Sequence, residues 1–542
     1  MLSKESVNIS TPLTEMARLQ PETAAIIFPE KNRTLTFSEL DQWSSRLAAG
    51  FEQAGIGRGV RTALLVPPSP ELFAITFALF KAGAVPVFID PGIGAKNMKG
   101  CLADAAPTAF IGIPKAHLAR RLLGWGKSTL KIMVTVNGGR IWGGVPLESL
   151  ERSGAYTHPL TVSDETAAIL FTSGSTGAPK GVVYSHGNFS AQIEALKDMY
   201  GIKPGEIDLP TFPLFALFAP ALGMTALIPE MDFTRPGSVD AAKILVTAIK
   251  YRATTMFGSP ALLNRVGRYG EENGINLPDM KRVISAGAPV PAATLERFAG
   301  LLPADAEIFT PYGATECLPV CSIGSREVLA ETAELTGKGR GICVGRPVRG
   351  LSLAVIRITE EPLEIWADGL KLPIGEIGEI VVSAPQATKE YFSRIEATRL
   401  AKIPDDEGRF WHRMGDLGYL DELGRVWFCG RKSHRVITSS ETLYTIPCEG
   451  VFNTHPEVFR TALVGIGAPG RKRPVLCVEL EKGVSGSWHE QIRIELLEIG
   501  AEYPHTAGIK EVLFHPAFPV DIRHNAKIFR EKLAVWAAGR VK

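Results

Sequence analysis

The strongest constraint on the fold is a strand, helix, strand pattern near the N-terminus. An apolar run at 62–66 predicts a strand, and a helical pattern from Pro70 to Lys81 follows, closed by Gly83. A second apolar run at 85–89 then ends at the turn residues Asp90-Pro91-Gly92. This order is typical of parallel strands whose faces are covered by helices. We therefore expect an α/β fold.

The same alternation extends in both directions along the chain. Upstream, apolar residues recur at helical spacing from Leu40 to Phe51, and Ser38 is placed to cap that helix. Downstream, the pattern resumes after residue 160 and returns at 254–257 and 283–286. The sequence therefore predicts several stacked α/β subdomains.

The pattern changes after about residue 340 to closely spaced strands and turns. Examples are the stretches 375–382 and 424–428, which predict a small antiparallel piece or a distorted β-barrel. Beyond Gly430-Arg431 the chain reads as a compact α+β unit. We predict a large N-terminal domain over 1–431 and a small mobile domain over 432–542, with a hinge near 432–435.

Composition excludes several classes of protein. The net charge of +2 over 542 residues gives no polyanion-binding signal, so no nucleic acid is expected as a partner. The seven cysteines include no C-x-x-C pair, which favours buried free thiols and a reducing cytoplasm. The first twenty residues have no apolar stretch of the kind that signals secretion.

One uncharged segment, 209–229, is about as long as a membrane-spanning helix. Four prolines divide it, so we expect a buried strand-and-helix piece that lines an apolar pocket, with insertion into a membrane surface as the alternative. No transmembrane segment is predicted.

The stretch from Thr172 to Gly181 is rich in hydroxyls and glycines and contains Lys180. Glycines let backbone N–H groups face an anion, hydroxyls donate to phosphate oxygens, and a lysine neutralises charge. The spacing fits neither a P-loop NTPase nor a serine-hydrolase elbow. A flexible linker is the alternative, but the strand-like residues before the loop favour a phosphate site.

Three further motifs follow in order. They are Tyr312-Gly313-Ala314-Thr315-Glu316, then Trp411 to Tyr419 with Gly430-Arg431, and Lys527 within Arg523 to Ile528. With the phosphate loop, they resemble the adenylate-forming superfamily of acyl-CoA synthetases, luciferases and peptide-synthetase adenylation domains. The resemblance covers nearly the whole chain, and it implies ATP and Mg²⁺ as cofactors.

The resemblance assigns roles position by position. It implies that the loop residues and mobile Lys180 hold the β- and γ-phosphates, the loop residues being Thr172, Ser173, Gly174, Ser175, Thr176 and Gly177. It implies that the adenine lies between Tyr312 with Gly313 and the wall formed by Gly287, Ala288 and Pro289. The remaining roles are α-phosphate contact for Thr315, Mg²⁺ for Glu316, ribose for Asp416 with Arg431, and transition-state charge for the catalytic Lys527.

The implied chemistry begins when a carboxylate attacks the α-phosphorus of ATP and pyrophosphate leaves. The second step is indicated by departures from the acyl-CoA synthetase pattern. Ala216 replaces the histidine that follows Pro-Leu-Phe in many of these enzymes, and the hinge aspartate and glycine read as Ser433 and Ser440. That glycine normally lets a pantetheine arm pass close to the backbone, so thioester formation is in doubt.

With these departures, the chain resembles the β-lactone synthetases of bacterial long-chain olefin biosynthesis. Such enzymes adenylate a 2-alkyl-3-hydroxy fatty acid, whose 3-hydroxyl then displaces AMP and closes a lactone. The resemblance implies a long-chain 2-alkyl-3-hydroxy acid as substrate and other olefin-pathway enzymes as partners. A fatty-acyl-CoA or acyl-AMP ligase, or an inactive nucleotide-binding scaffold, are the alternatives.

Five apolar residues are candidates for the alkyl pocket, although ordinary core packing explains them equally well: Phe212, Phe215, Leu217, Phe218 and Leu222. No base for the 3-hydroxyl can be named. His412, His434 and His524 are candidates, and each pattern is more typical of a structural or exposed histidine.

Overall fold

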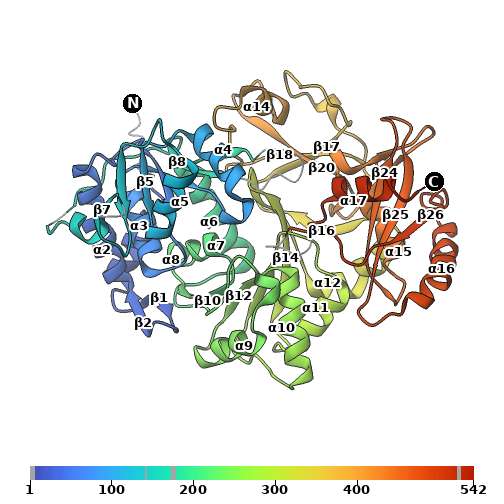
Figure 1. The fold of residues 1–542 in the computed structure, drawn as a ribbon, viewed down its shortest axis with the longest axis horizontal. Helices are drawn as coiled ribbons and strands as arrows, with labels where there is room; N and C mark the ends of the chain where they lie inside the picture. The colour runs from blue at the N-terminus through green and yellow to red at the C-terminus, as the bar shows by residue number, and fades with distance from the viewer. Residues whose placement is uncertain (1–6, 141–142, 155, 172–178, 522–526, 542) are drawn as a thin grey trace.

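The computed structural model describes residues 7–140, 143–154, 156–171, 179–521 and 527–541 (Figure 1). A seven-stranded sheet occupies the blue and teal part of the ribbon, in the order β7-β6-β5-β3-β4-β8-β9. Its strands are parallel except for the β8 and β9 pair. They span Arg61–Leu65 (β3), Val85–Phe88 (β4), Ala109–Gly112 (β5), Ile132–Thr135 (β6), Val145–Pro146 (β7), Thr166–Phe171 (β8) and Gly181–Ser185 (β9).

Helices connect and cover these strands. Their bounds are Thr11–Leu19 (α1), Phe37–Gln53 (α2), Pro70–Lys81 (α3), Ala95–Ala105 (α4), Pro114–Leu123 (α5) and His186–Tyr200 (α6). Helix α3 has the predicted bounds because Ser69 caps it, accepting from the backbone N–H of Leu72, and all its residues except Glu71 are buried. Helix α2 begins earlier than predicted. Its cap is Thr36, in a capping box with Glu39, so the assignment of the cap to Ser38 was wrong.

A second, 14-stranded sheet carries most of the remaining chain. Its parallel part is β14-β13-β12-β10-β11-β1, with β2 antiparallel at the edge. These strands span Ala24–Phe28 (β1), Arg33–Thr36 (β2), Ile207–Pro210 (β10), Thr225–Leu227 (β11), Thr255–Gly258 (β12), Arg282–Ser285 (β13) and Glu307–Ala314 (β14). Helices Ala241–Lys250 (α9), Pro260–Glu272 (α10) and Ala292–Ala299 (α11) pack beside it with a core of their own.

The same sheet continues as an antiparallel run, β15-β16-β21-β20-β18-β17, with β19 paired to β20. The strands span Cys317–Gly324 (β15), Ile342–Pro347 (β16), Ser352–Ile356 (β17), Gly378–Ser383 (β18), Lys402–Pro404 (β19), Phe410–Leu420 (β20) and Val426–Arg431 (β21). The predicted change to antiparallel strands is confirmed. Over the described ranges the strand path does not close into a ring, so this region is an open extension of the large sheet rather than a barrel.

The C-terminal part, red in Figure 1, forms a separate three-stranded sheet, β24-β25-β26. Its elements are Val436–Ile437 (β22), Thr442–Leu443 (β23), Thr445–Phe452 (α15), Val458–Ile466 (β24), Arg473–Leu480 (β25), His489–Ala501 (α16), Glu511–Phe514 (β26) and Arg530–Ala538 (α17). Apolar side chains on both faces of this sheet form two clusters. Helix α15 also contacts β21 of the large sheet. The predicted boundary between residues 431 and 432 stays a prediction.

The uncharged segment 209–229 folds as the buried strand-and-helix piece that the prolines predicted. Strand β10 is followed by two short helices, Pro213–Ala216 (α7) and Phe218–Ala221 (α8), and then by β11. Across the described parts of the chain, no helix is both long and apolar enough to cross a membrane. All seven cysteines are buried free thiols.

Candidate active site

The motif from Tyr312 to Glu316 forms the end of β14 and its turn into β15. Gly313 lies so close to the returning strand that a side chain there would meet the Cys317 carbonyl oxygen at 2.9 Å. The Tyr312 hydroxyl donates to Asp416 Oδ2 at 2.7 Å. Burial, and then the Asp416 charge, raise the pKa of Tyr312 well above its usual range, so this hydroxyl keeps its proton.

Asp416 and Arg431 face each other because β20 and β21 pair in that register. Arg431 Nη1 lies 3.1 Å from Asp416 Oδ1, and the aspartate is only 3% exposed. Burial raises the pKa of Asp416, and the charges of Arg431 and Lys527 and the Tyr312 hydroxyl oppose that rise. Asp416 Oδ1 is buried and ion-paired with Arg431, but it accepts no hydrogen bond of regular geometry from the described residues. It can therefore accept from a hydroxyl of a bound ligand.

Glu316 is fixed by a residue far away in sequence. Tyr391 donates its hydroxyl to Glu316 Oε1 at 2.6 Å, and the same ring lies 4.8 Å from Lys180 Nζ. The Thr388 backbone N–H donates to the Glu316 carbonyl at 2.9 Å, while the Tyr184 hydroxyl donates to the Thr315 carbonyl. A carboxylate and a lysine ammonium thus both contact one tyrosine, the carboxylate at its hydroxyl and the ammonium over its ring.

The donor set near Glu316 fits a cation that is shared with a ligand. Within the described residues, no group of three or more His, Cys, Asp and Glu side chains could hold a metal ion alone. Mg²⁺ is usually bound through one or two carboxylates, with phosphate and water oxygens completing the shell. Glu316 can supply that carboxylate.

Lys527 comes to this site from the C-terminal part of the chain. It lies next to a β-bridge between Val520 and Ile528, and its carbonyl accepts from the Asp521 N–H at 2.9 Å. Its positive charge contributes to the pKa of Asp416, which places the ammonium within electrostatic reach of the pair with Arg431. Three separated motifs therefore meet at one place.

The segment Gly287-Ala288-Pro289 follows β13, the strand that pairs with β14. Gly287 has φ +97°, a left-handed conformation that favours glycine, and it is exposed. Because β13 and β14 are parallel neighbours, this segment leaves the sheet on the same side as the Tyr312 motif.

The acyl candidates lie on α7 and α8 or directly beside them, and the three phenylalanines are held by ring packing. Phe215 contacts Phe212 and Phe257, with ring centroids 5.3 and 4.4 Å apart. Phe218 contacts Phe189 at 5.9 Å, and Leu217 packs partly buried against the main core. Leu222 belongs to that core and is 6% exposed, so core packing alone explains it. Ala216, in the place of the family histidine, is fully enclosed at 2% exposure.

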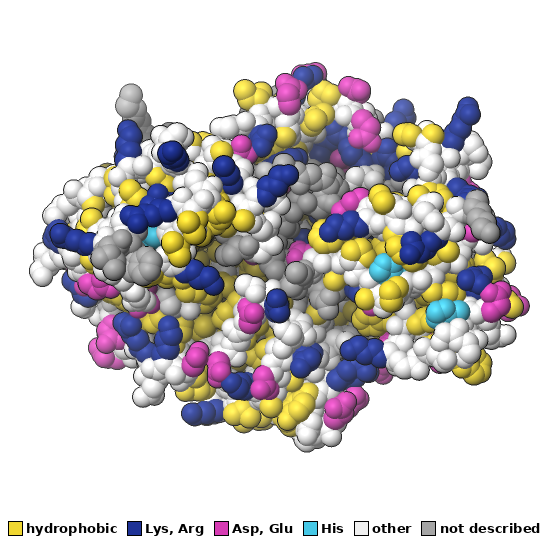
Figure 2. Space-filling model, viewed as in Figure 1, with side chains coloured by type: hydrophobic (Ala, Val, Ile, Leu, Met, Phe, Trp, Pro, Cys, Tyr) yellow, Lys and Arg dark blue, Asp and Glu magenta, His cyan; other side chains and the backbone are white. Residues whose placement is uncertain are grey.

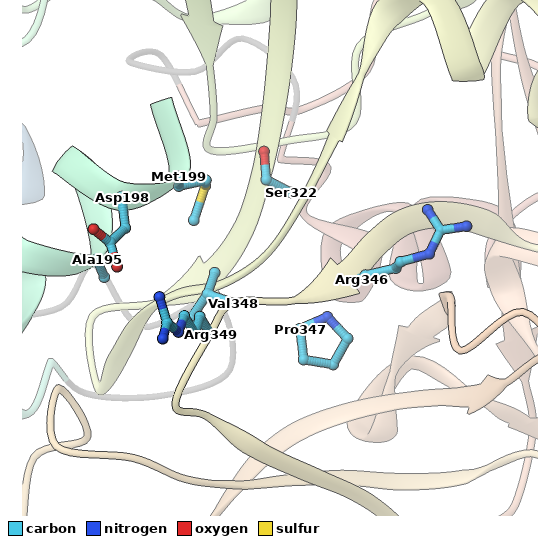
Figure 3. A pocket seen from close by; sticks show the side chains of 8 residues that line it. All are labelled: Ala195, Asp198, Met199, Ser322, Arg346, Pro347, Val348 and Arg349. Atoms are coloured by element: carbon cyan, nitrogen blue, oxygen red, sulfur yellow. The ribbon is translucent and has the colours of Figure 1, made fainter. Parts of the chain in front are cut away.

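A cavity of about 410 Å³ lies elsewhere, where α6 meets β15 and the end of β16. Figure 3 shows Met199 and Asp198 on α6, Ser322 on β15, and the segment from Arg346 to Arg349 around it. None of the predicted site residues lines this cavity. It is therefore separate from the site around Asp416.

Residues 13–392 match the protein family described as "AMP-binding enzyme". The chain belongs to this family. Membership makes it an AMP-forming, ATP-dependent enzyme, as the motifs predicted.

Two relatives match over nearly the whole chain. The olefin beta-lactone synthetase of Xanthomonas campestris pv. campestris is 51% identical, with 98% of this chain and 97% of that protein covered. The olefin beta-lactone synthetase of Stenotrophomonas maltophilia is 49% identical, with 99% of each covered. Among solved structures, the amide bond synthetase of Marinactinospora thermotolerans has the same fold, with a TM-score of 0.80, 21% identity, and 97% and 99% of the two chains covered.

The structure brings together six predicted residues: Lys180, Tyr312, Glu316, Asp416, Arg431 and Lys527. The loop residues Thr172 to Gly177 and the candidate base His524 lie outside the described residues. Of the other histidines, His412 is fully buried, and burial lowers the pKa of His434 to about 3. The sequence analysis did not identify Tyr391, because no motif in the neighbouring sequence indicates that its side chain contacts Glu316.

Proposed function

We propose that this protein is an ATP-dependent olefin β-lactone synthetase that acts on long-chain 2-alkyl-3-hydroxy acids. The single observation that carries this choice is the near-complete alignment with two olefin beta-lactone synthetases at about half identity. The site geometry supports the first half of the reaction, in which the acid becomes an acyl-adenylate.

The nucleotide would lie between two groups of residues. Tyr312 would stack on the adenine, with Gly313 and the Gly287-Ala288-Pro289 segment on either side. Asp416 would accept from the ribose hydroxyls, and its buried Oδ1, which is ion-paired with Arg431 but accepts no regular hydrogen bond from the described residues, supports this role. Arg431 would keep Asp416 ionised against the cost of burial.

The phosphates would lie on the Lys180 side. Thr172, Ser173, Gly174, Ser175, Thr176 and Gly177 would donate to the β- and γ-phosphates with Lys180, and Thr315 would contact the α-phosphate. Glu316 would hold Mg²⁺. When bound, the metal ion neutralises phosphate charge and orients the leaving pyrophosphate.

Lys527 would act at the reacting centre. As the substrate carboxylate attacks the α-phosphorus, negative charge grows on the equatorial oxygens, and an ammonium there stabilises the transition state. The nearness of Lys527 to Asp416 supports an arrangement suited to adenylation. We propose that 432–542 moves as a unit relative to 1–431 and carries Lys527 into and out of the site.

The second half of the reaction needs no external nucleophile. The 3-hydroxyl attacks the acyl carbon, loses its proton, and displaces AMP, and its place in the same molecule provides a high effective concentration. Ser440 lies in an exposed turn with Thr438, with a side chain where the family glycine leaves space. This supports a reaction that uses no pantetheine arm. Phe212, Phe215, Leu217 and Phe218 are proposed to line the alkyl pocket.

The test is incubation with ATP, Mg²⁺ and a 2-alkyl-3-hydroxy acid, with and without CoA. We expect a β-lactone, AMP and pyrophosphate without CoA. A product that forms only with CoA would contradict lactone closure and favour a fatty-acyl-CoA ligase. If no acid tested yields AMP, the scaffold hypothesis replaces both.

Two wider proposals rest on the same resemblance. We propose that the enzyme works in the cytoplasm with other enzymes of olefin biosynthesis. The buried free state of all seven cysteines supports a reducing compartment.

A further inference from the structure

One stretch of the chain carries a charge that the overall balance hides. Between Asp104 and Glu148 there are six Lys and Arg residues and no Asp or Glu. The whole chain has a net charge of +2, so removing these six charges leaves −4 for the rest (+2 − 6 = −4). The six residues are Lys115, Arg120, Arg121, Lys127, Lys131 and Arg140.

The fold keeps these charges together. The stretch forms β5, α5, β6 and β7, which make up one edge of the seven-stranded sheet. Five of the six side chains are exposed, and Arg120 is half-buried with its Nε lacking a hydrogen-bond partner. As far as the structure describes the chain, none of the six forms a salt bridge within 4.0 Å. The carboxylate that directly precedes the stretch, Asp104, pairs instead with the exposed Arg394. The positive charge of this edge is therefore not neutralised by the protein.

Helix α5 adds exposed apolar surface to the same edge. Leu118, Leu122 and Leu123 are 46%, 76% and 42% exposed. The helix is anchored by its opposite face, where buried His117 hydrogen-bonds through Nε2 to the Val134 carbonyl oxygen at 3.0 Å. Lys115, Leu118 and Leu122 follow helical spacing and share the outward face. Figure 2 shows dark blue and yellow side chains close together over the region where α5 lies.

We propose that this edge, called here the α5 surface and made of the six basic residues with Leu118, Leu122 and Leu123, binds the surface of an anionic phospholipid membrane. Leucines flanked by lysine and arginine on an exposed helix can insert between headgroups, while the cations contact lipid phosphates. An uncompensated positive edge on a chain that is otherwise negative would also orient the molecule toward such a surface.

This surface gives the enzyme access to substrates that dissolve in lipid. This access to lipid-dissolved substrates rests on the proposed function, because only an enzyme that acts on a long-chain acid needs it. Binding itself does not, and it can be measured without substrate or ATP. Failure of membrane binding and failure of the lactone assay are therefore distinguishable.

The test is co-sedimentation of the full chain with vesicles of phosphatidylcholine, alone or mixed with phosphatidylglycerol. We expect binding to the mixed vesicles only, weakened by salt. In the triple variant Lys115→Glu, Arg121→Glu, Lys127→Glu, binding should fall by at least about 100-fold, since each cation near an anionic surface contributes roughly fivefold. Leu122→Ser should weaken binding by about tenfold at unchanged charge.

The matched control is the triple variant Lys203→Glu, Lys482→Glu, Lys510→Glu, which changes three exposed lysines elsewhere by the same total charge. It should bind like the wild type. All variants should keep wild-type adenylation in the absence of vesicles, which shows that they fold. Equal losses in the two triple variants, or no binding to the mixed vesicles, would overturn the proposal, and in the latter case an acidic protein would be the remaining occupant.

Discussion

The proposed nucleotide side and the proposed acyl side of the candidate site are built in different ways. On the nucleotide side, Tyr312, Asp416 and Arg431 are joined by a hydrogen bond and an ion pair on neighbouring strands. On the acyl side, Phe212 and Phe215 pack through their rings around two four-residue helices. Buried charges need specific partners, whereas apolar packing tolerates substitutions of similar volume. The first side suits chemistry common to a family, and the second can change with the substrate.

The largest effect should come from Lys527→Ala. Because its ammonium is proposed to meet charge that develops only in the transition state, adenylation should fall by about 10³-fold or more while ATP binding survives. Pyrophosphate exchange and ATP titration measure the two quantities. Lys532→Ala, an exposed lysine on α17, should leave both unchanged. Wild-type exchange in Lys527→Ala would remove this lysine from the site.

Asp416→Asn should act on binding rather than on the chemical step. It keeps the shape of the side chain but removes the charge opposite Arg431 and one hydrogen-bond acceptor, so ATP affinity should fall by about 10-fold to 100-fold. Calorimetric titration with ATP measures it. Asp421→Asn is the control, since that aspartate serves Arg425 and Trp427 in the next turn. Equal losses of affinity in both variants would indicate a general effect on stability.

Tyr391→Phe should have a smaller effect that is specific to the metal. The ring beside Lys180 remains, but Glu316 loses the donor that lies at 2.6 Å, so the Mg²⁺ concentration needed for half-maximal rate should change by about tenfold. Initial rates over a series of Mg²⁺ concentrations show this. The matched control is Tyr419→Phe, whose hydroxyl donates to the Arg340 carbonyl. An unchanged Mg²⁺ dependence would make Tyr391 a structural residue only.

Local patterns predicted much of the nucleotide side. Helix α3 was bounded correctly because Pro70 begins its apolar helical run and Gly83 follows closely after its end. The motif residues Tyr312, Asp416 and Lys527 were assigned by resemblance, and the fold brings them together.

What the sequence did not predict depends on contacts between distant positions. Tyr391 reaches Glu316 across 75 positions, and no spacing rule connects them. The antiparallel strands would close into a barrel only if the first and last strands of the run paired. The residue pattern within each strand does not predict whether that pairing forms. The cluster of basic residues in the α5 surface is visible in the sequence, but the nearly neutral net charge of the whole chain conceals it.

The smallest effect should come from the acyl side, through Phe215→Ala. Removing this ring opens space beside Phe212 and Phe257, so the preferred alkyl chain should lengthen, with a change in relative kcat/KM of about threefold to tenfold. Competition between acids of graded chain length measures the preference. Phe459→Ala, at an exposed position on β24, should leave it unchanged. If Phe215→Ala lowers stability without changing the preference, these rings belong to the core. The alkyl chain would then lie elsewhere, and the contrast between the two sides would describe packing rather than recognition.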